Sequence, residues 1–367
     1  MKIIKRVIYS ILGLIGLFLL YVIIAIAHGT ATDFQPEQLI DLEVKGTTNL
    51  DTINTDTLDF MIWNVGYGGL GAESNFFYDS GKMLTSGDKM IRATEEMVSK
   101  NITGAAKTLV ENSVDFYLLQ EVDAGSKRSY YHNEYEKYAK TLQSYASTYA
   151  TNYNVTRVPL PVAEPFNVMG RIKSGLATYS KFQPHTPQRH QLPGGYAWPN
   201  NIFHLDRCMA IHRYNVKNGK ELIVVNSHNS AYDEGGVLKK QEMDYLKTLI
   251  LEEYEKGNYV IVGADWNQCP PSFKPNTFRP EITPDAYYQI NIAPDFLPEG
   301  WTWAYDETTP TNRKLTESYR GQEKETFVTL IDFFLTSPNV EVLKTEGVDV
   351  DFEYSDHQPV KMKIALK

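Results

Sequence analysis

Residues 259–267 read Tyr259-Val260-Ile261-Val262-Gly263-Ala264-Asp265-Trp266-Asn267, an apolar run that leads directly into an acid and an amide. Such a short apolar run is typical of a strand that is buried on both faces. A helix of about 20 residues is predicted just upstream from its 3.6-residue periodicity, ending at Gly257. Before that helix, a second apolar strand at 222–225 runs into Asn226-Ser227-His228. This region is therefore predicted to form a strand–helix–strand unit with polar residues at the end of each strand.

The first half of the chain repeats this arrangement. An apolar run at 58–63 stops at Asn64, a helix is predicted at 89–111, and the apolar run 114–119 ends at Gln120-Glu121. Later strands are predicted at 328–335, 340–343 and 360–364. Many buried strands with helices between some of them indicate sheets covered by helices. We therefore expect an α/β fold in which two packed β-sheets are flanked by helices, a four-layer α/β sandwich.

One N-terminal transmembrane helix is expected to precede this domain. The run 7–27 carries no charge and is long enough to cross a bilayer, which needs about 20 apolar residues. Lys2, Lys5 and Arg6 precede it, so the positive-inside rule places the N-terminus in the cytoplasm and the domain on the exported side. The small-x-small pattern at 25–27 leaves a cleaved signal peptide, and hence secretion, as the alternative.

These patterns divide the chain into an anchor or signal segment at 1–27, a polar tether at 28–57 and one domain at 58–367. The net charge of −9 provides no general basic field for non-specific nucleic-acid binding, although a metal ion and a local basic patch could serve a nuclease. The two cysteines, Cys208 and Cys269, could form a disulfide in an oxidising compartment, but two buried thiols are the favoured interpretation.

The residues that could carry chemistry lie at or beside the ends of apolar runs. They are Asn64, Glu121, His228, Asp265, Asn267, Asp332, Asp356 and His357. Loops at strand ends are where a rigid scaffold commonly presents functional groups. Taken singly, most have a structural alternative, such as a turn at Asn64 or an Asx turn at Asp265. Asp332 is harder to explain structurally, because a carboxylate inside the apolar run 330–335 is costly to bury without a partner.

Six motifs in this order resemble the endonuclease/exonuclease/phosphatase superfamily. They are Ile62-Trp63-Asn64, Leu118-Leu119-Gln120-Glu121-Val122-Asp123, Asn226-Ser227-His228, Val262-Gly263-Ala264-Asp265-Trp266-Asn267, Ile331-Asp332-Phe333-Phe334 and Ser355-Asp356-His357. That group includes pancreatic-type deoxyribonucleases, apurinic endonucleases, neutral sphingomyelinases and inositol-polyphosphate phosphatases. The resemblance runs from about residue 58 to the C-terminus. The chain departs from the usual motif by inserting Ala264 before Asp265, and it lacks the extended signatures of the inositol-polyphosphate 5-phosphatases. Two histidines make it more similar to deoxyribonucleases and sphingomyelinases.

The resemblance implies a metal-dependent hydrolase and assigns expected roles to these residues. Glu121 is the first-choice Mg²⁺ ligand, with Asn64 and Asp356 beside it, and Mn²⁺ is an expected substitute. His357 is expected to act as general base or to polarise the phosphate, with Asp332 holding its tautomer.

The remaining expected roles concern the water and the phosphate. Asp265 is expected to orient the attacking water or bind metal, and Asn267 to donate to a phosphoryl oxygen. His228 is expected to act from the other side as general acid or transition-state donor. Arg207 matches a phosphate-contacting position of nuclease-like members, with a strand-edge ion pair as its alternative. Arg128 is a weaker candidate of the same kind.

The expected substrate is a phosphate ester in a nucleic acid, a phospholipid headgroup or a small molecule, and no obligate protein partner is inferred. Aromatic residues in the predicted loops could stack on bases, sit at a membrane interface or cover the core. A non-catalytic binding module on the same fold is the main alternative function. A carbohydrate- or peptide-active hydrolase with paired carboxylates would leave the Asp-x-Asn and Asp-His pairs unexplained.

Overall fold

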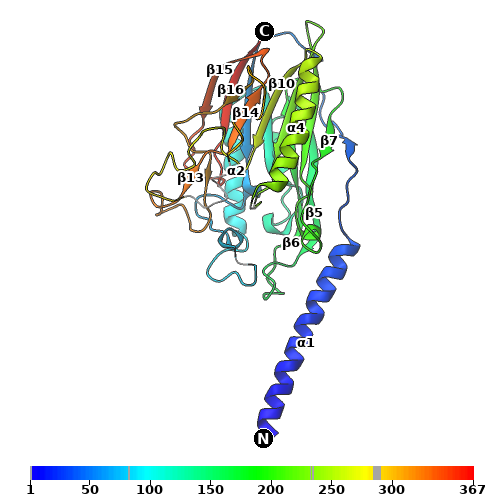
Figure 1. Ribbon diagram of the computed structural model, residues 1–367, viewed down its shortest axis with the longest axis vertical. Helices are drawn as coiled ribbons and strands as arrows, with labels where there is room; N and C mark the ends of the chain where they lie inside the picture. The colour runs from blue at the N-terminus through cyan, green and yellow to red at the C-terminus, as the bar shows by residue number, and fades with distance from the viewer. Residues whose placement is uncertain (1, 82, 232, 234, 284–290) are drawn as a thin grey trace.

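The computed structural model describes residues 2–81, 83–231, 233, 235–283 and 291–367. Within them, two large β-sheets pack face to face with helices outside, and a long helix, α1, projects from one end (Figure 1). The predicted four-layer α/β sandwich is confirmed.

The first sheet has the strand order β1-β7-β8-β9-β10-β14-β11, and β2 pairs with β8. Its strands are β1 (Leu39–Asp41), β2 (Thr52–Ile53), β7 (Gln188–Gln191), β8 (Cys208–Val216), β9 (Glu221–His228), β10 (Tyr259–Asp265), β11 (Thr302–Ala304) and β14 (Asp332–Thr336). The second sheet has the order β15-β16-β3-β4-β6-β5. Its strands are β3 (Thr57–Asn64), β4 (Phe116–Asp123), β5 (Ala146–Val158), β6 (Gly170–Ser180), β15 (Val340–Gly347) and β16 (Val360–Leu366). A small separate pair is formed by β12 (Asn312–Arg313) and β13 (Val328–Thr329).

The central strands are buried on both faces, which explains their unbroken apolar runs. In β3, Phe60 and Ile62 point into the layer between the sheets, whereas Met61 and Trp63 point outward toward helix α2. The period-2 alternation of a strand thus supplies two separate cores from one run. The strands β4, β9 and β10 are divided between inner and outer cores in the same way.

The helices cover the outer faces. Among the residues that the structure describes, the α-helices of the domain are α2 (Glu95–Glu111), α3 (Glu134–Thr141) and α4 (Val237–Glu255). The 3-10 turns in the same residues are η1 (Gly66–Gly68), η2 (Phe77–Ser80), η3 (Lys127–Ser129) and η4 (Asn201–Phe203). Helix α4 ends as predicted at Gly257, whose φ of 82° permits the bonds Gly257 N–H to Tyr254 O and Asn258 N–H to Glu253 O. This hydrogen-bond pattern is a Schellman motif, which satisfies carbonyls that the helix end leaves free.

Helix α1 (Lys2–Ala31) is long and apolar enough for a membrane span or a signal sequence. Its last turn contacts the domain directly. The hydroxyl of Thr32 lies 2.8 Å from that of Thr156 in β5, and Nε1 of Trp198 donates to Oγ1 of Thr30 at 3.2 Å. In Figure 1, α1 extends away from the domain at the end opposite the C-terminus.

Three boundaries differ from the sequence-based expectations. The segment 28–57, expected as a polar tether, continues α1 to Ala31 and adds β1 and β2 to the first sheet, because strands of two or three residues are too short to show periodicity. Helix α2 begins at Glu95 instead of residue 89, where the side chain of Thr94 caps it by accepting from Met97 N–H. The expected strand at 328–335 is divided into β13 and β14, because the Thr311 hydroxyl accepts the N–H groups at the break.

Candidate active site

Strand register brings four of the expected site residues to one end of the sandwich. In the first sheet, Asp265 at the end of β10 pairs with His228 on parallel β9 and with Asp332 on antiparallel β14. In the second sheet, Asn64 ends β3 beside the parallel strand β4. Parallel strands deliver their carboxyl ends to the same edge, so both strand–helix–strand units contribute to a single site.

Asp332 and His357 form a hydrogen-bonded pair. Oδ2 of Asp332 lies 2.8 Å from Nδ1 of His357, and both side chains are buried. Burial would lower the pKa of His357, but the carboxylates of Asp332, Asp356 and Asp265 outweigh it and raise this pKa well above its ordinary value. Burial raises the pKa of Asp332 to about 6, against the opposing effect of His357. The pair therefore favours an imidazolium whose Nδ1–H is committed to Asp332.

Asp265 lies at the centre of the site. Its Oδ2 accepts from Nδ2 of Asn64 at 2.9 Å and lies 3.4 Å from Nε2 of His228 and 3.7 Å from Nε2 of His357. Its Oδ1 accepts the backbone N–H of Asn267 at 3.0 Å. Burial would raise the pKa of Asp265, but the two histidines and these donors lower it below its ordinary value. The central carboxylate is thus held ionised.

Glu121 and Asp356 lie close enough at the same end of the second sheet for their charges to interact. Glu121 has a φ of 53° at an interruption of the β4–β6 register, a conformation that L-residues seldom adopt and that is often found at functional sites. Burial and then the Glu121 charge raise the pKa of Asp356 to about 7, although His357 opposes the shift. Asn64 donates from Nδ2 to Glu121 at 3.3 Å, while its Oδ1 accepts from Gly66 N–H. Two mutually repelling carboxylates with oxygen ligands nearby are suited to a hard divalent cation.

His228 and Arg207 line the cavity on the side of the first sheet. Burial, with the positive charge of Arg207, lowers the pKa of His228 to about 3, so this ring is neutral. Nη1 of Arg207 donates to the carbonyl of His228 at 3.4 Å. Arg207 directly precedes β8 and lines the cavity described below.

A second group of ligand atoms also suits a metal. Among the residues that the structure describes, ligand atoms of Asp265, Asp332 and His357 all lie within 4.8 Å of one another. The site thus holds an acid–histidine group that joins the two sheets and a carboxylate pair at the end of the second sheet.

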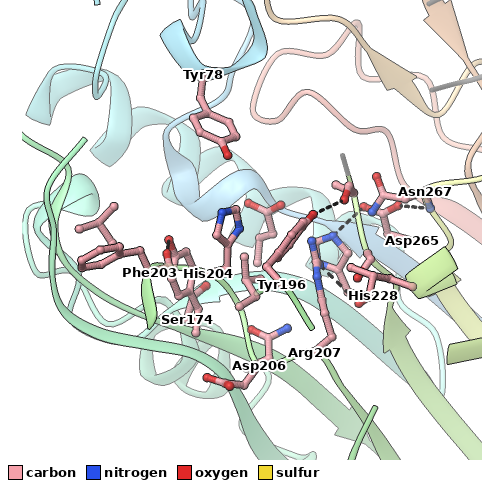
Figure 2. Close-up of a pocket in the computed structure, with 18 of the residues that line it drawn as sticks. Tyr78, Ser174, Tyr196, Phe203, His204, Asp206, Arg207, His228, Asp265 and Asn267 are labelled. Carbon is pink, nitrogen blue, oxygen red and sulfur yellow. Dashed lines mark hydrogen bonds and ion pairs between the residues drawn. The ribbon is translucent and has the colours of Figure 1, made fainter. Parts of the chain in front are cut away.

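Seven of the nine predicted site residues line one cavity of about 780 Å³, and the two exceptions are Asn64 and Asp332. The cavity-lining members of the predicted set are Glu121, Arg207, His228, Asp265, Asn267, Asp356 and His357. Asn64 and Asp332 lie behind them and contact Asp265 and His357. Figure 2 shows His228, Asp265 and Asn267 together at one side of this cavity, with Arg207 and Tyr196 beside them.

Several residues of the site were not predicted from the sequence. Nδ2 of Asn312 lies 3.1 Å from Nε2 of His357, and Arg313 donates to three carbonyls of the loop that follows Asn64. Between the sheets, Nε2 of Gln120 donates to Oδ1 of Asn226 at 2.8 Å. Asn312 and Arg313 lie in a two-residue strand without periodicity, whereas Gln120 and Asn226 were visible as polar residues at strand ends.

The remaining expectations have plain outcomes. Arg128 makes a buried ion pair with Asp123, stacks with its guanidinium 3.6 Å from the Tyr67 ring centre and also lines the cavity. Cys208 and Cys269 are both free and buried.

Comparisons with known proteins agree with this geometry. The sequence profile of the Endonuclease/Exonuclease/phosphatase family matches residues 61–357. No curated protein matches the chain in sequence. Among solved structures, an endonuclease/exonuclease/phosphatase from Beutenbergia cavernae DSM 12333 has a TM-score of 0.54 and 16% identity, covering 85% of this chain and 72% of that one.

Two further solved structures share the fold. The human Nocturnin catalytic domain with bound sulfate has a TM-score of 0.51 and 14% identity, covering 89% of this chain and 98% of that one. ANGEL2, a 2′,3′-cyclic phosphatase in complex with adenosine-2′,3′-vanadate, has a TM-score of 0.54 and 14% identity, covering 89% and 99%. The strand-end residues, the sandwich and the profile match lead to one conclusion: this chain belongs to the endonuclease/exonuclease/phosphatase family.

Proposed function

We propose that this protein is a Mg²⁺-dependent hydrolase of phosphate esters. One observation carries the proposal: His357, held from behind by Asp332, and the ionised Asp265 line the same cavity as the carboxylate pair Glu121–Asp356. Two proteins that share the fold have been solved with phosphate-like groups bound, namely Nocturnin with sulfate and ANGEL2 with adenosine-2′,3′-vanadate.

Glu121 and Asp356 are the residues that would hold the cation. Their proximity, which raises the pKa of Asp356, fits a site completed by positive charge. The amide nitrogen of Asn64 donates a hydrogen bond to Glu121, which supports a role for Asn64 in orienting that metal ligand. A bound Mg²⁺ would neutralise phosphoryl charge and activate water, and Mn²⁺ is the expected substitute.

The protein residues account for the remaining requirements of the reaction. Water attacks phosphorus, a new P–O bond forms, the ester P–O bond breaks and the leaving oxygen takes up a proton. Asp265, held ionised, orients the water. His357 donates from Nε2 to a phosphoryl oxygen, because Asp332 occupies Nδ1. The low pKa of His228 favours a neutral hydrogen-bond donor over a general acid.

Asn267 and Arg207 are assigned to the phosphate. Asn267 follows Asp265 with a φ of 50°, and its Nδ2 donates to the Asn229 carbonyl. Arg207 supplies positive charge on the cavity wall next to His228. A non-catalytic binding module would not need this complete set, since every matched position retains a chemically competent side chain.

We further propose that α1 is a retained anchor and that the domain lies on the exported side. The basic residues before α1 and its apolar length support this topology. The test of the activity is an assay of the full chain with Mg²⁺ and with EDTA against a plain diester, a monoester, DNA, RNA, a 2′,3′-cyclic phosphate and phospholipids. Mg²⁺-dependent release from at least one substrate is expected, and inertness toward all of them would contradict the proposal.

A further inference from the structure

The cavity extends from the site residues to the segment that follows α1. At one end it is lined by Asp265 and His357, and at the other by Asp33, Phe34 and Pro36. Only Thr32 separates the end of α1 from the first of these lining residues. In Figure 2, Phe203 lies on the side opposite His228 and Asp265, with His204 and Tyr196 between them. The space is thus continuous from the chemistry to the base of α1.

The arm of the cavity that leads to α1 has apolar walls. Its apolar lining residues are Phe34, Val158, Leu160, Met169, Phe203 and Leu205, and the polar residues Asp33, Ser174 and Asp206 lie among them. A nucleic-acid backbone or a small polar ester has little apolar surface to bury there. A molecule with a phosphate ester at one end and a hydrocarbon portion at the other matches both ends of the cavity.

The apolar arm lies at the place where α1 joins the domain. The last turn of α1 packs closely on Phe203, since a Cβ added at Gly29 would lie 2.8 Å from the Phe203 ring. The bonds from Thr32 to Thr156 and from Trp198 to Thr30 fix the same junction. Because α1 projects away from this end of the domain (Figure 1), a bilayer that holds α1 would lie on the side of the domain where the arm meets α1.

Exposed side chains near this junction have the composition of a membrane-contacting surface. Leu84 is 60% exposed and Phe166 is 98% exposed, and their loops are joined by the bonds Val162 N–H to Met83 O and Ala163 N–H to Leu84 O. Exposed bulky apolar residues in adjacent loops mark interaction sites rather than ordinary surface.

Basic residues flank the loop that carries Phe166. Arg157 donates to the carbonyl of Pro165 at 2.8 Å, and Arg92 to that of Val168 at 3.5 Å. Burial, followed by the positive charges of Arg92 and Arg157, lowers the pKa of Lys127, so the three basic residues belong to one cluster. Within the described part of the chain, none of the three forms an ion pair with a carboxylate. Positive charge next to apolar loop tips suits an anionic lipid surface.

From these observations, and resting on the phosphoesterase activity proposed above, we infer that the substrate is a membrane lipid. Its phosphate ester would occupy the site at Asp265 and His357, and its hydrocarbon portion the arm lined by Phe34 and Phe203. The lipid belongs to the same bilayer that holds α1, so it enters the arm without leaving the membrane surface.

The test uses the full chain reconstituted in vesicles of phosphatidylcholine and phosphatidylserine. These vesicles also carry sphingomyelin, phosphatidylglycerol or phosphatidic acid. Release of the water-soluble phosphate product is compared with hydrolysis of a soluble diester, bis(p-nitrophenyl) phosphate, and of a DNA and an RNA oligonucleotide. At least one lipid should be cleaved with kcat/KM tenfold or more above every soluble substrate.

Two variants and a control test whether the lipid binds through the apolar arm and whether the exposed loops contact the membrane. Phe34→Ser should raise KM for the long-chain lipid at least fivefold but not for a short-chain lipid with the same headgroup. Leu84→Ser combined with Phe166→Ser should slow vesicle hydrolysis about tenfold and leave the soluble diester within twofold. Leu343→Ser changes a residue that is 46% exposed on β15, away from the cavity lining, and should affect neither. Melting temperatures verify that each variant folds.

The outcomes separate this inference from the proposed function. Mg²⁺-dependent hydrolysis of the soluble diester or the oligonucleotides, with no cleavage of any lipid, overturns the lipid assignment and leaves the phosphoesterase standing. Equal KM for long-chain and short-chain lipids in Phe34→Ser also overturns it. Inertness toward every substrate with Mg²⁺ instead rejects the phosphoesterase itself.

Discussion

Oδ2 of Asp332 lies 2.8 Å from Nδ1 of His357, although Asp332 begins β14 in the first sheet and His357 lies three residues before the start of β16 in the second. The hydrogen bond therefore joins the two halves of the sandwich at the site. It also accounts for a carboxylate inside an apolar run, because the imidazole supplies the partner that burial requires.

The pair should behave as one unit in catalysis. We predict that His357→Ala lowers kcat by about 10²–10⁴-fold. It should also lower the melting temperature, because it leaves the buried carboxylate of Asp332 without its partner. Asp332→Asn should also lower kcat, because Nδ1 of His357 loses its anionic partner. The double variant should be little worse than His357→Ala alone. Turnover and thermal melting of the three variants measure this, and effects that simply multiply would show independent roles.

Removal of metal should abolish activity. We predict that EDTA stops hydrolysis and that Mg²⁺ or Mn²⁺ restores it. Glu121→Gln should raise the Mg²⁺ concentration needed for half-maximal rate, because a neutral amide binds a hard cation less well than a carboxylate. Glu136→Gln is the matched control, since that residue forms only a partly exposed ion pair with Lys45. Full activity in chelator would reject the metal mechanism.

Gly263 should resist enlargement. A Cβ at this position would lie 2.4 Å from Ile62 and 2.7 Å from Leu118, both on the opposing sheet. We predict that Gly263→Ala lowers the free energy of unfolding by about 1–3 kcal/mol through overpacking. It should also lower kcat, because Asp265 is two residues away. Gly195→Ala, where an added Cβ meets no atom within 4 Å, is the stability control in denaturant titrations. If the free energy of unfolding of Gly263→Ala equalled that of the wild type, the two sheets would be able to move apart and accommodate the added methyl group without loss of stability.

Topology can be measured independently of activity. If α1 is an anchor with its N-terminus in the cytoplasm, an alkaline phosphatase fused after Lys367 should be active only on the exported side. Moving the charges of Lys2, Lys5 and Arg6 to the other end of α1 should weaken that orientation. A fusion that is active in the cytoplasm would contradict the proposed export. Recovery of the protein without residues 1–27 would show cleavage instead.

Acid should weaken the domain partly through Glu253. Burial would raise the pKa of Glu253, but hydrogen bonds from Arg213, Lys256 and Asn258 lower it to about 2. Because its folded-state pKa lies below the unfolded value, its contribution to stability is present above about pH 4.5 and is lost as the pH falls toward 2. We predict that Glu253→Gln melts below wild type at pH 6 and that the difference shrinks by pH 3. A difference independent of pH would point to packing alone.

The central strands were predictable from the sequence because each is buried on both faces. The runs before Asn64 and Asp265 are continuous and apolar for that reason, and their ends locate the polar residues of the site. Asp332 was identified as a site residue for a different reason, because it places a charge inside an apolar run where an apolar residue would be expected.

Outer strands left weaker signals. The strand β5 at Ala146–Val158 is rich in Tyr, Thr and Asn and mixes buried with partly exposed residues, so its composition resembles that of a loop. Asn312 reaches His357 through a direct antiparallel backbone bridge between these two residues, a long-range contact that no local pattern encodes. The joining of α1 to Phe203 likewise depends on tertiary packing.

The bridges from Asn64 to Asp265 and from Gln120 to Asn226 connect side chains that are more than 100 positions apart in the chain. Half of the site comes from each sheet, so no single strand–helix–strand unit contains a working set. A nascent chain therefore cannot cleave anything until its last strands have docked, and hydrolytic activity appears only with the completed sandwich. On the proposed exported topology, assembly of the fold would itself be the safeguard against premature reaction.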